Sequence, residues 1–180
     1  MENTLNPEIL RAAQKGELKA FDAIVSSYQT AIYNHLYRLT HDKDDAADLA
    51  QETFLKLYKT RERIRAEENF RSYLYKIATN TAYDWLKKKK RQPEDLIIDA
   101  EDGNFETIEA QQSYYKVERL ELVGLEMAMV KIKPAYQNLL ILYYQQGFTY
   151  DEISDITGQP LNTVKVGLYR AKKELLKNIE

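Results

Sequence analysis

The chain has 180 residues, a formal net charge of -2 and no cysteine, which excludes disulfides and thiolate zinc sites and suits a reducing compartment. Its longest purely apolar run, residues 139–144, is far shorter than the ~20 residues that a membrane-spanning helix needs. The first ten residues lack the pattern of a signal peptide. We therefore expect a cytoplasmic protein without membrane insertion.

Helices are predicted along the whole N-terminal half, because apolar residues recur three and four positions apart and no segment alternates like a strand. Asn6 followed by Pro7 is typical of a helix start, and Gly16 is a plausible end for that helix. Asp42 is predicted to cap a helix that runs to about Lys59. A loop then leads into the longest helix.

That longest helix is predicted over residues 70–91, ahead of Pro93, and its last turn carries five consecutive basic residues that suit the helix dipole. The next segment, 92–115, contains seven acidic residues and no basic one, without an apolar period. This composition predicts a flexible acidic linker that is extended by self-repulsion. The alternative is that this segment serves only as a spacer that keeps the chain soluble.

Four further helices are expected after the linker, at about 117–132, 134–146, 149–157 and 160–178. The predicted fold is therefore all-α, with two small helical domains joined by a flexible acidic linker. The predicted boundaries are 1–91 for an N-terminal helical bundle, 92–116 for the linker and 117–180 for a C-terminal four-helix domain with a helix-turn-helix.

The helix-turn-helix is predicted from residues 148–176. Thr149 and Glu152 form a capping box, Gly158 permits a tight turn, and Pro160 opens a second, basic helix. Such a second helix enters the major groove of DNA, where residues near its start reach base edges. A helical hairpin with a solvated basic face is the alternative.

The outer face of the second helix supplies the candidate DNA contacts. Those expected near bases are Asn162, Thr163, Lys165 and Val166; those expected near phosphates are Arg170, Lys172 and Lys173, with Tyr169 on the same face.

Four segments of the chain resemble, in order, the small two-domain sigma factors of the extracytoplasmic-function (ECF) group. They are GELKAFDAIVSSY (16–28), DDAADLAQETFLKLYK (44–59), FRSYLYKIATNTAYDWLKKKKR (70–91) and GFTYDEISDITGQPLNTVKVGLYRAKKEL (147–175). The resemblance implies that the chain binds core RNA polymerase and promoter DNA and nucleates strand opening. It also implies that the linker threads the active-site cleft and RNA exit channel of the polymerase.

The resemblance assigns two sets of candidate residues to the N-terminal half. The polymerase-binding set is Asp45, Asp48, Leu49, Gln51, Glu52, Phe54 and Leu55; the minus-ten set is Arg63, Arg65, Phe70, Lys76, Asn80, Lys87, Lys88, Lys89, Lys90 and Arg91. Within the second set, Asn80 would read a base edge, the lysines would hold phosphates, and the arginines beside Phe70 would flank a flipped base. From the residues alone, the helix face of the first set could equally be ordinary solvated surface, and Phe54 could be core or an exposed anchor.

The recognition helix departs from the family pattern at two positions. The family usually continues after Thr-Val-Lys with a small polar residue and an arginine, whereas this chain has Val166 and Gly167. A cation that the family commonly uses on DNA is thus absent, and an interior glycine destabilises a helix by about 1 kcal/mol. Val166 is a candidate contact for a thymine methyl group.

Two other functions are considered. A stand-alone helix-turn-helix regulator would explain the C-terminal half but not residues 44–59 or the acidic segment. An enzyme is disfavoured, because His35 and His41 make a poor metal pair and no phosphate-binding loop or nucleophile motif occurs. We expect no catalytic residues, metal or cofactor, and a monomer when free. The resemblance adds an anti-sigma factor as a candidate partner, because many members of the group are held inactive by one.

Overall fold

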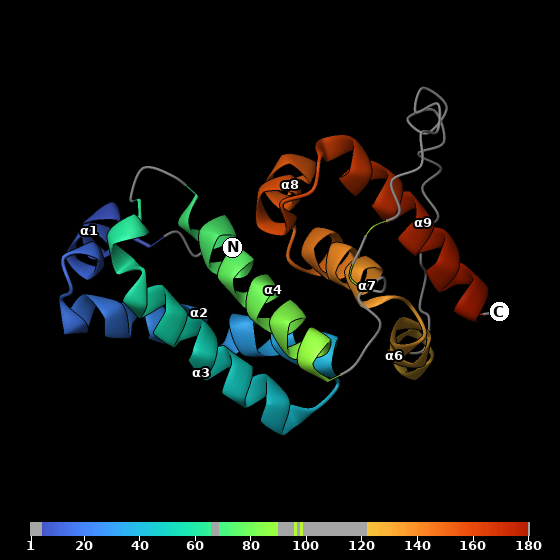
Figure 1. Ribbon diagram of the computed structural model, residues 1–180, viewed down its shortest axis with the longest axis horizontal. Coiled ribbons are helices and arrows are strands. Elements are labelled where there is room, and N and C mark those ends of the chain that lie inside the picture. The colour runs from blue at the N-terminus through green and yellow to red at the C-terminus, as the bar shows by residue number, and fades with distance from the viewer. Residues whose placement is uncertain (1–4, 66–68, 90–95, 97, 99–121, 180) are drawn as a thin grey trace. The chain divides into compact units, whose positions relative to one another are not determined.

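The computed structural model of the chain describes residues 5–65, 69–89, 96, 98 and 122–179 (Figure 1). In these ranges every regular element is a helix and there is no strand, which confirms the all-α prediction. Tertiary contacts divide the chain into two compact units. The N-terminal unit contains the helices up to residue 88, and the C-terminal unit contains those from residue 122 onward.

The N-terminal unit is built on three long helices that pack against one another, preceded by a short one. These are α1 (Pro7–Gln14), α2 (Leu18–Thr40), α3 (Lys43–Lys59), the 3-10 turn η1 (Arg61–Arg63) and α4 (Phe70–Lys88). Helix α2 contacts both α3 and α4, which also contact each other, and α1 lies against α2 and η1. Ile24, Leu57 and Leu74 are among the fully buried apolar residues, one from each long helix.

Capping side chains mark the starts of α1 and α3 where the sequence predicts them. The Oδ1 atom of Asn6 accepts a hydrogen bond from the backbone N–H of Glu8 at 2.9 Å. The Oδ1 atom of Asp42 accepts from the N–H groups of Asp44 and Asp45 at 2.9 and 3.0 Å. Because these acceptors satisfy amides that have no partner inside the helix, α1 and α3 begin where predicted.

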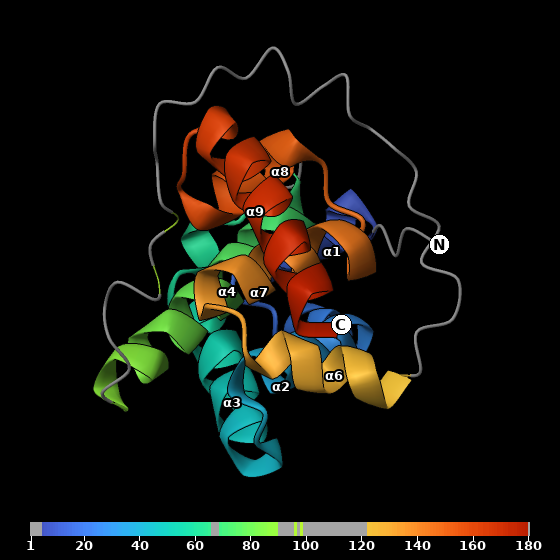
Figure 2. The same cartoon turned by 90° about the vertical axis from the view of Figure 1, so that its right-hand side faces the viewer.

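The C-terminal unit contains α6 (Leu122–Val130), α7 (Pro134–Leu140), η3 (Ile141–Gln145), α8 (Tyr150–Thr157) and α9 (Leu161–Ile179). Helix α9 packs along α7 and also contacts α6 (Figure 1 and Figure 2). The capping box of Thr149 and Glu152 is present, and Gly158 ends α8 with a φ of 70°. This left-handed conformation favours glycine, so the tight turn between α8 and α9 is confirmed.

One element differs from the prediction of a single helix over 134–146. The chain leaves α7 through a π-helical turn, η3, in which the N–H of Gln146 donates to the carbonyl of Ile141 at 3.0 Å. A π-turn inserts one extra residue per turn, and the apolar pattern LLILYY does not distinguish it from an α-helical turn. The ring of Tyr143 in η3 stacks on that of Tyr150, the first residue of α8, with the centroids 5.0 Å apart.

Most of the predicted linker lies outside the described residues, as do 117–121 of the first helix expected after it. Two residues of the linker, Leu96 and Ile98, are described and both are buried. Among the described helices, none combines the length and the apolar character that spanning a bilayer requires.

Candidate protein- and nucleic-acid-binding surfaces

Helix α3 presents an exposed face with an apolar centre. Asp48, Gln51, Glu52 and Leu55 are all exposed, at the spacing of three and four that places them on one side of the helix. Leu55 is 60% exposed, and the Nζ of Lys56 pairs with Glu52 at 2.9 Å. An uncovered leucine framed by polar groups is suited to docking a protein partner.

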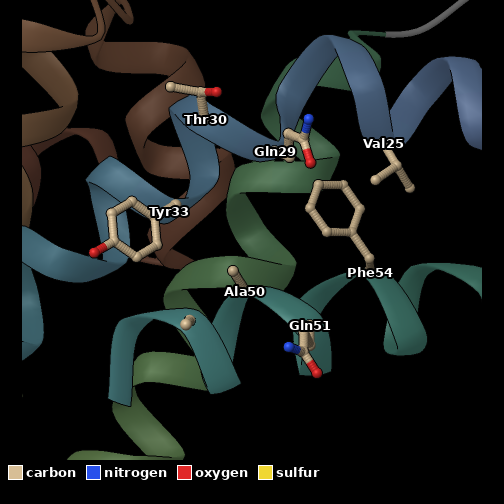
Figure 3. Close-up of a pocket in the computed structure, with 8 residues that line it drawn as sticks. Val25, Gln29, Thr30, Tyr33, Ala50, Gln51 and Phe54 are labelled. Atoms are coloured by element: carbon tan, nitrogen blue, oxygen red, sulfur yellow. The ribbon is translucent and has the colours of Figure 1, made fainter. Parts of the chain in front are cut away.

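A groove of about 380 Å³ runs beside this face, between α2 and α3 (Figure 3). Gln51 and Phe54 line it from α3, and Phe54 is only 8% exposed, so its ring forms a wall of the groove. The other lining residues are Ala47 and Ala50 of α3 with Val25, Gln29, Thr30 and Tyr33 of α2. Sequence reasoning missed the α2 side, although its residues 25, 29 and 33 recur every four positions.

Three members of the polymerase-binding set do not lie on the open face, and one of them is Phe54, the buried wall of the groove. Leu49 is 4% exposed and belongs to the core, because it points to the apolar side of α3. Both carboxylate oxygens of Asp45 already have partners within the chain. Its Oδ1 accepts a hydrogen bond from the Nε1 of Trp85 at 3.2 Å, and its Oδ2 pairs with the Nζ of Lys89 at 2.8 Å. The structure therefore narrows the exposed set to Asp48, Gln51, Glu52 and Leu55.

Helix α4 carries an exposed polar and basic stripe. Lys76, Asn80 and Lys87 are exposed and lie four and seven residues apart, which places them on one face, and Lys88 is exposed beside them. Lys89 is also exposed but is paired with Asp45. Lys90 and Arg91, the remaining members of the predicted basic run, lie outside the described residues.

Phe70 is not available to stack on a flipped base in this structure. It is 6% exposed and packs its ring against that of Tyr28, with the centroids 5.7 Å apart in an edge-to-face arrangement. The first residue of an amphipathic helix can face either way, and here it faces the core. Arg63 and Arg65 are exposed, whereas residues 66–68 between them and α4 lie outside the described ranges.

On α9, Asn162, Tyr169 and Lys173 are exposed and Lys165, Arg170 and Lys172 are half-buried. Thr163 and Val166 are buried, and Val166 is only 5% exposed. Both side chains are thus turned away from the exposed face of α9, and a contact of Val166 with a thymine methyl stays a prediction. Apart from Thr163, the polar and charged members of the predicted set are exposed or half-buried.

Gly167 is explained by close packing. A Cβ at this position would lie 2.6 Å from the Cδ1 of Leu139 and 2.8 Å from the Cγ2 of Ile98, closer than carbon atoms can approach. The glycine in the middle of α9 thus admits α7 on one side and a residue of the predicted linker on the other. A side chain here would have to displace one of them.

Comparisons with known proteins agree with this arrangement of helices. Residues 24–92 match the family model for sigma-70 region 2, and residues 122–175 match the model for sigma-70 region 4. RNA polymerase sigma factor YlaC of Bacillus subtilis is 31% identical over 160 residues, which cover 89% of this chain and 92% of YlaC. The ECF RNA polymerase sigma-E factor of Escherichia coli K12 is 30% identical in an alignment of 182 positions, which covers 97% of this chain and 95% of that protein.

Solved structures show the same fold. The sigma factor RpoE of Bartonella quintana, determined in complex with the anti-sigma factor NepR, has a TM-score of 0.67 at 21% identity and covers 89% of this chain and 96% of its own. CnrH, determined with the cytosolic domain of CnrY, has a TM-score of 0.69 at 18% identity and covers 95% of this chain and 94% of its own. The chain therefore belongs to the ECF group of the sigma-70 family and acts in promoter-specific transcription initiation by RNA polymerase.

Proposed function

We propose that the two units divide promoter recognition and that α3 joins the chain to core polymerase. In this assignment the exposed face of α3 and the α2–α3 groove bind the polymerase, α4 contacts the minus-ten element and α9 contacts the minus-thirty-five element. The polymerase performs the chemistry, the chain acts without catalytic residues of its own, and the site of action is the cytoplasm.

The observation that carries the polymerase assignment is Leu55. At 60% exposed, it is a large apolar side chain without cover on a face that is otherwise polar, directly beside the groove walled by Phe54. Burying such a leucine in an interface contributes about 1.5–3 kcal/mol. A protein partner that covers Leu55 and fills the groove would gain this energy while keeping Gln51 and Glu52 hydrogen-bonded at the rim.

The DNA assignment of α4 and α9 rests on accessible polar chemistry. The exposed amide of Asn80 matches the bidentate pattern that reads an adenine edge, and Lys76 and Lys87 flank it on the same face. On α9, Asn162 near the helix start and Lys173 farther along are exposed in the way a recognition helix requires. Each phosphate that such a lysine neutralises adds about 0.9 to the log-log salt slope of binding.

The acidic linker fits a path through the polymerase. Seven acidic and no basic residues over 92–115 would be repelled by DNA and attracted to a positively charged protein channel, where the segment would resemble RNA electrostatically. An anti-sigma factor is a second proposed partner, supported by the complex of the similar sigma factor RpoE with NepR. It would compete with polymerase for the groove and the face of α3.

Replacing Leu55 with glutamate tests the polymerase assignment. We expect the Leu55→Glu chain to bind core polymerase about tenfold more weakly or worse, because a charge replaces the buried leucine at the contact. The measurement is a titration of core enzyme with labelled chain. The matched control is Leu18→Glu, at a leucine of α2 that is 66% exposed and lies outside the candidate sites.

Both variants should unfold at the same temperature as the parent, since both positions face solvent. Equal core-polymerase affinities of the Leu55→Glu and Leu18→Glu chains would contradict the assignment of the α3 face.

A further inference from the structure

Three side chains join the start of α3 to the end of α4: Asp45, Trp85 and Lys89, which we call the Asp45 cluster. The carboxylate of Asp45 uses both oxygens, one accepting from the indole N–H at 3.2 Å and the other pairing with the ammonium group at 2.8 Å. The Nζ of Lys89 also lies 4.6 Å from the centre of the Trp85 ring, within cation–π distance. Each member therefore contacts the other two.

The backbone of Asp45 is held in place by the cap at the start of α3. The backbone N–H of Asp45 donates to Asp42 at 3.0 Å, and this bond is the main reason that the pKa of Asp42 is lowered, with smaller contributions from the N–H of Asp44 and the charge of Lys89. The side chain of Asp45 is only 24% exposed, against 56% for Lys89. Asp45 is therefore the less exposed member of the pair, with its backbone tied to Asp42, and Lys89 is the more exposed side chain that it binds.

What the cluster holds is the basic end of α4. Lys89 is the C-cap residue, with its N–H donating to the carbonyl of Trp85 at 3.0 Å, and Lys87 and Lys88 lie in the same last turn. The last turn of a helix frays unless tertiary contacts fix it. An unfixed turn would present its lysines to DNA in many orientations, and few of these would match the spacing of phosphates.

We infer that Asp45 is a positioning residue for DNA binding, which orients the basic end of α4 through Trp85 and Lys89, and that it does not contact the polymerase. This inference rests on the proposed role of α4 at the promoter. It reassigns Asp45 from the face that the family resemblance gave it, because a carboxylate whose two oxygens are already occupied inside the chain has to break those contacts before it can bind a partner.

The inference predicts an effect opposite to that of simple electrostatics. Asp45→Asn removes one negative charge, so charge alone would strengthen binding to DNA. If Asp45 instead positions the lysines, binding should weaken, and the log-log salt slope should fall by about 1 to 2 as one or two phosphate contacts are lost. Asp44→Asn is the matched control, because Asp44 is exposed, lies in the same first turn of α3, and loses the same charge and the same favourable interaction with the helix dipole.

Two measurements test it. In the free chain, Trp85 is the single tryptophan, so its fluorescence reports on the cluster without any partner. We expect acrylamide to quench Trp85 more strongly in Asp45→Asn than in Asp44→Asn, and Asp45→Glu to restore part of the protection. In complex with core polymerase, we expect Asp45→Asn to lower promoter affinity and its salt slope relative to Asp44→Asn, with unchanged affinity of the chain for core enzyme.

Three results would overturn the inference. The first is equal quenching of Trp85 in the two asparagine variants, and the second is equal promoter affinity and salt slope. The third is weaker binding of Asp45→Asn to core polymerase with no loss at the promoter, which would make Asp45 a polymerase contact. If the parent chain fails to bind core polymerase at all, the proposed function is wrong. The fluorescence comparison uses the free chain, so it still tests whether Asp45 holds Trp85 in place.

Discussion

Lowering the pH from 7 to 5 should reduce the free energy of unfolding of the N-terminal unit by about 2 kcal/mol, and a single buried histidine should account for it. His35 of α2 is fully buried between helices, with its Nε2 3.4 Å from the Oγ1 of Thr79 and its ring edge-to-face with Tyr75. Burial, aided by the charge of Arg38, lowers the pKa of His35 from 6.5 to about 3.

Stability falls as the pH falls because the unfolded chain binds a proton at His35 more readily than the folded chain does. Above pH 6.5 the imidazole is neutral in both the folded and the unfolded chain, so its full contribution to stability is present. Below pH 6.5 the unfolded chain takes up a proton that the folded chain refuses, and stability is lost progressively until the pH reaches about 3. Carboxylates titrate mainly below this range, so the interval from pH 7 to pH 5 isolates the histidine.

Urea unfolding at several pH values, followed by circular dichroism, measures the effect. His35→Gln should remove the loss between pH 7 and pH 5, because the amide does not titrate. His41→Asn is the matched control: His41 is exposed at the end of α2 with a φ of 56°, a conformation that asparagine tolerates. A parent protein whose stability is unchanged over this interval, or a His35→Gln variant that retains the loss, would contradict the explanation.

Replacing Gly167 with leucine should destabilise the C-terminal unit by about 2 kcal/mol, although glycine is a poor helix former. Removing an interior glycine normally stabilises a helix by about 1 kcal/mol. Here the new Cβ would lie 2.6 Å from Leu139 and 2.8 Å from Ile98, and Leu139 is fully buried with little room to move. Overpacking of this kind usually destabilises by about 1–3 kcal/mol, which outweighs the gain in helix propensity.

The control for this change is Tyr169→Leu, two residues along α9, where the side chain is 44% exposed and the effect on stability should stay within about 0.5 kcal/mol. A double-mutant cycle between positions 167 and 98 tests whether Ile98, a residue of the predicted linker, packs against Gly167. The destabilisation by Gly167→Ala should shrink in an Ile98→Ala background, because one of the two clashing groups is gone. Strict additivity of the two changes would show that Ile98 does not pack on Gly167 in solution.

Local rules predicted much of the fold, because the signals lie within a few residues of the features they specify. The side chain of Asp42 caps α3, Thr149 and Glu152 form the box at the start of α8, and Gly158 takes the left-handed conformation that ends it. The exposed stripe of Asp48, Glu52 and Leu55 also follows from helical periodicity alone.

What could not be predicted depends on contacts between distant segments. Phe54 could face the core or solvent, and only the packing of α2 against α3 decides it. The pairing of Asp45 with Lys89 joins residues that are 44 positions apart. From the sequence, Gly167 only weakens the helix propensity of α9. The close approach of Leu139 and Ile98, which requires a glycine there, is visible only in the structure.

Run-off transcription with purified core polymerase and a library of promoter sequences tests the central claim most directly. The chain should produce transcripts that core enzyme alone does not, from templates that share two sequence elements upstream of the start, one for each unit. Core polymerase should be required for tight, specific promoter binding by the chain. Specific binding to duplex DNA by the free chain, together with no added transcripts in the presence of core enzyme, would contradict the account.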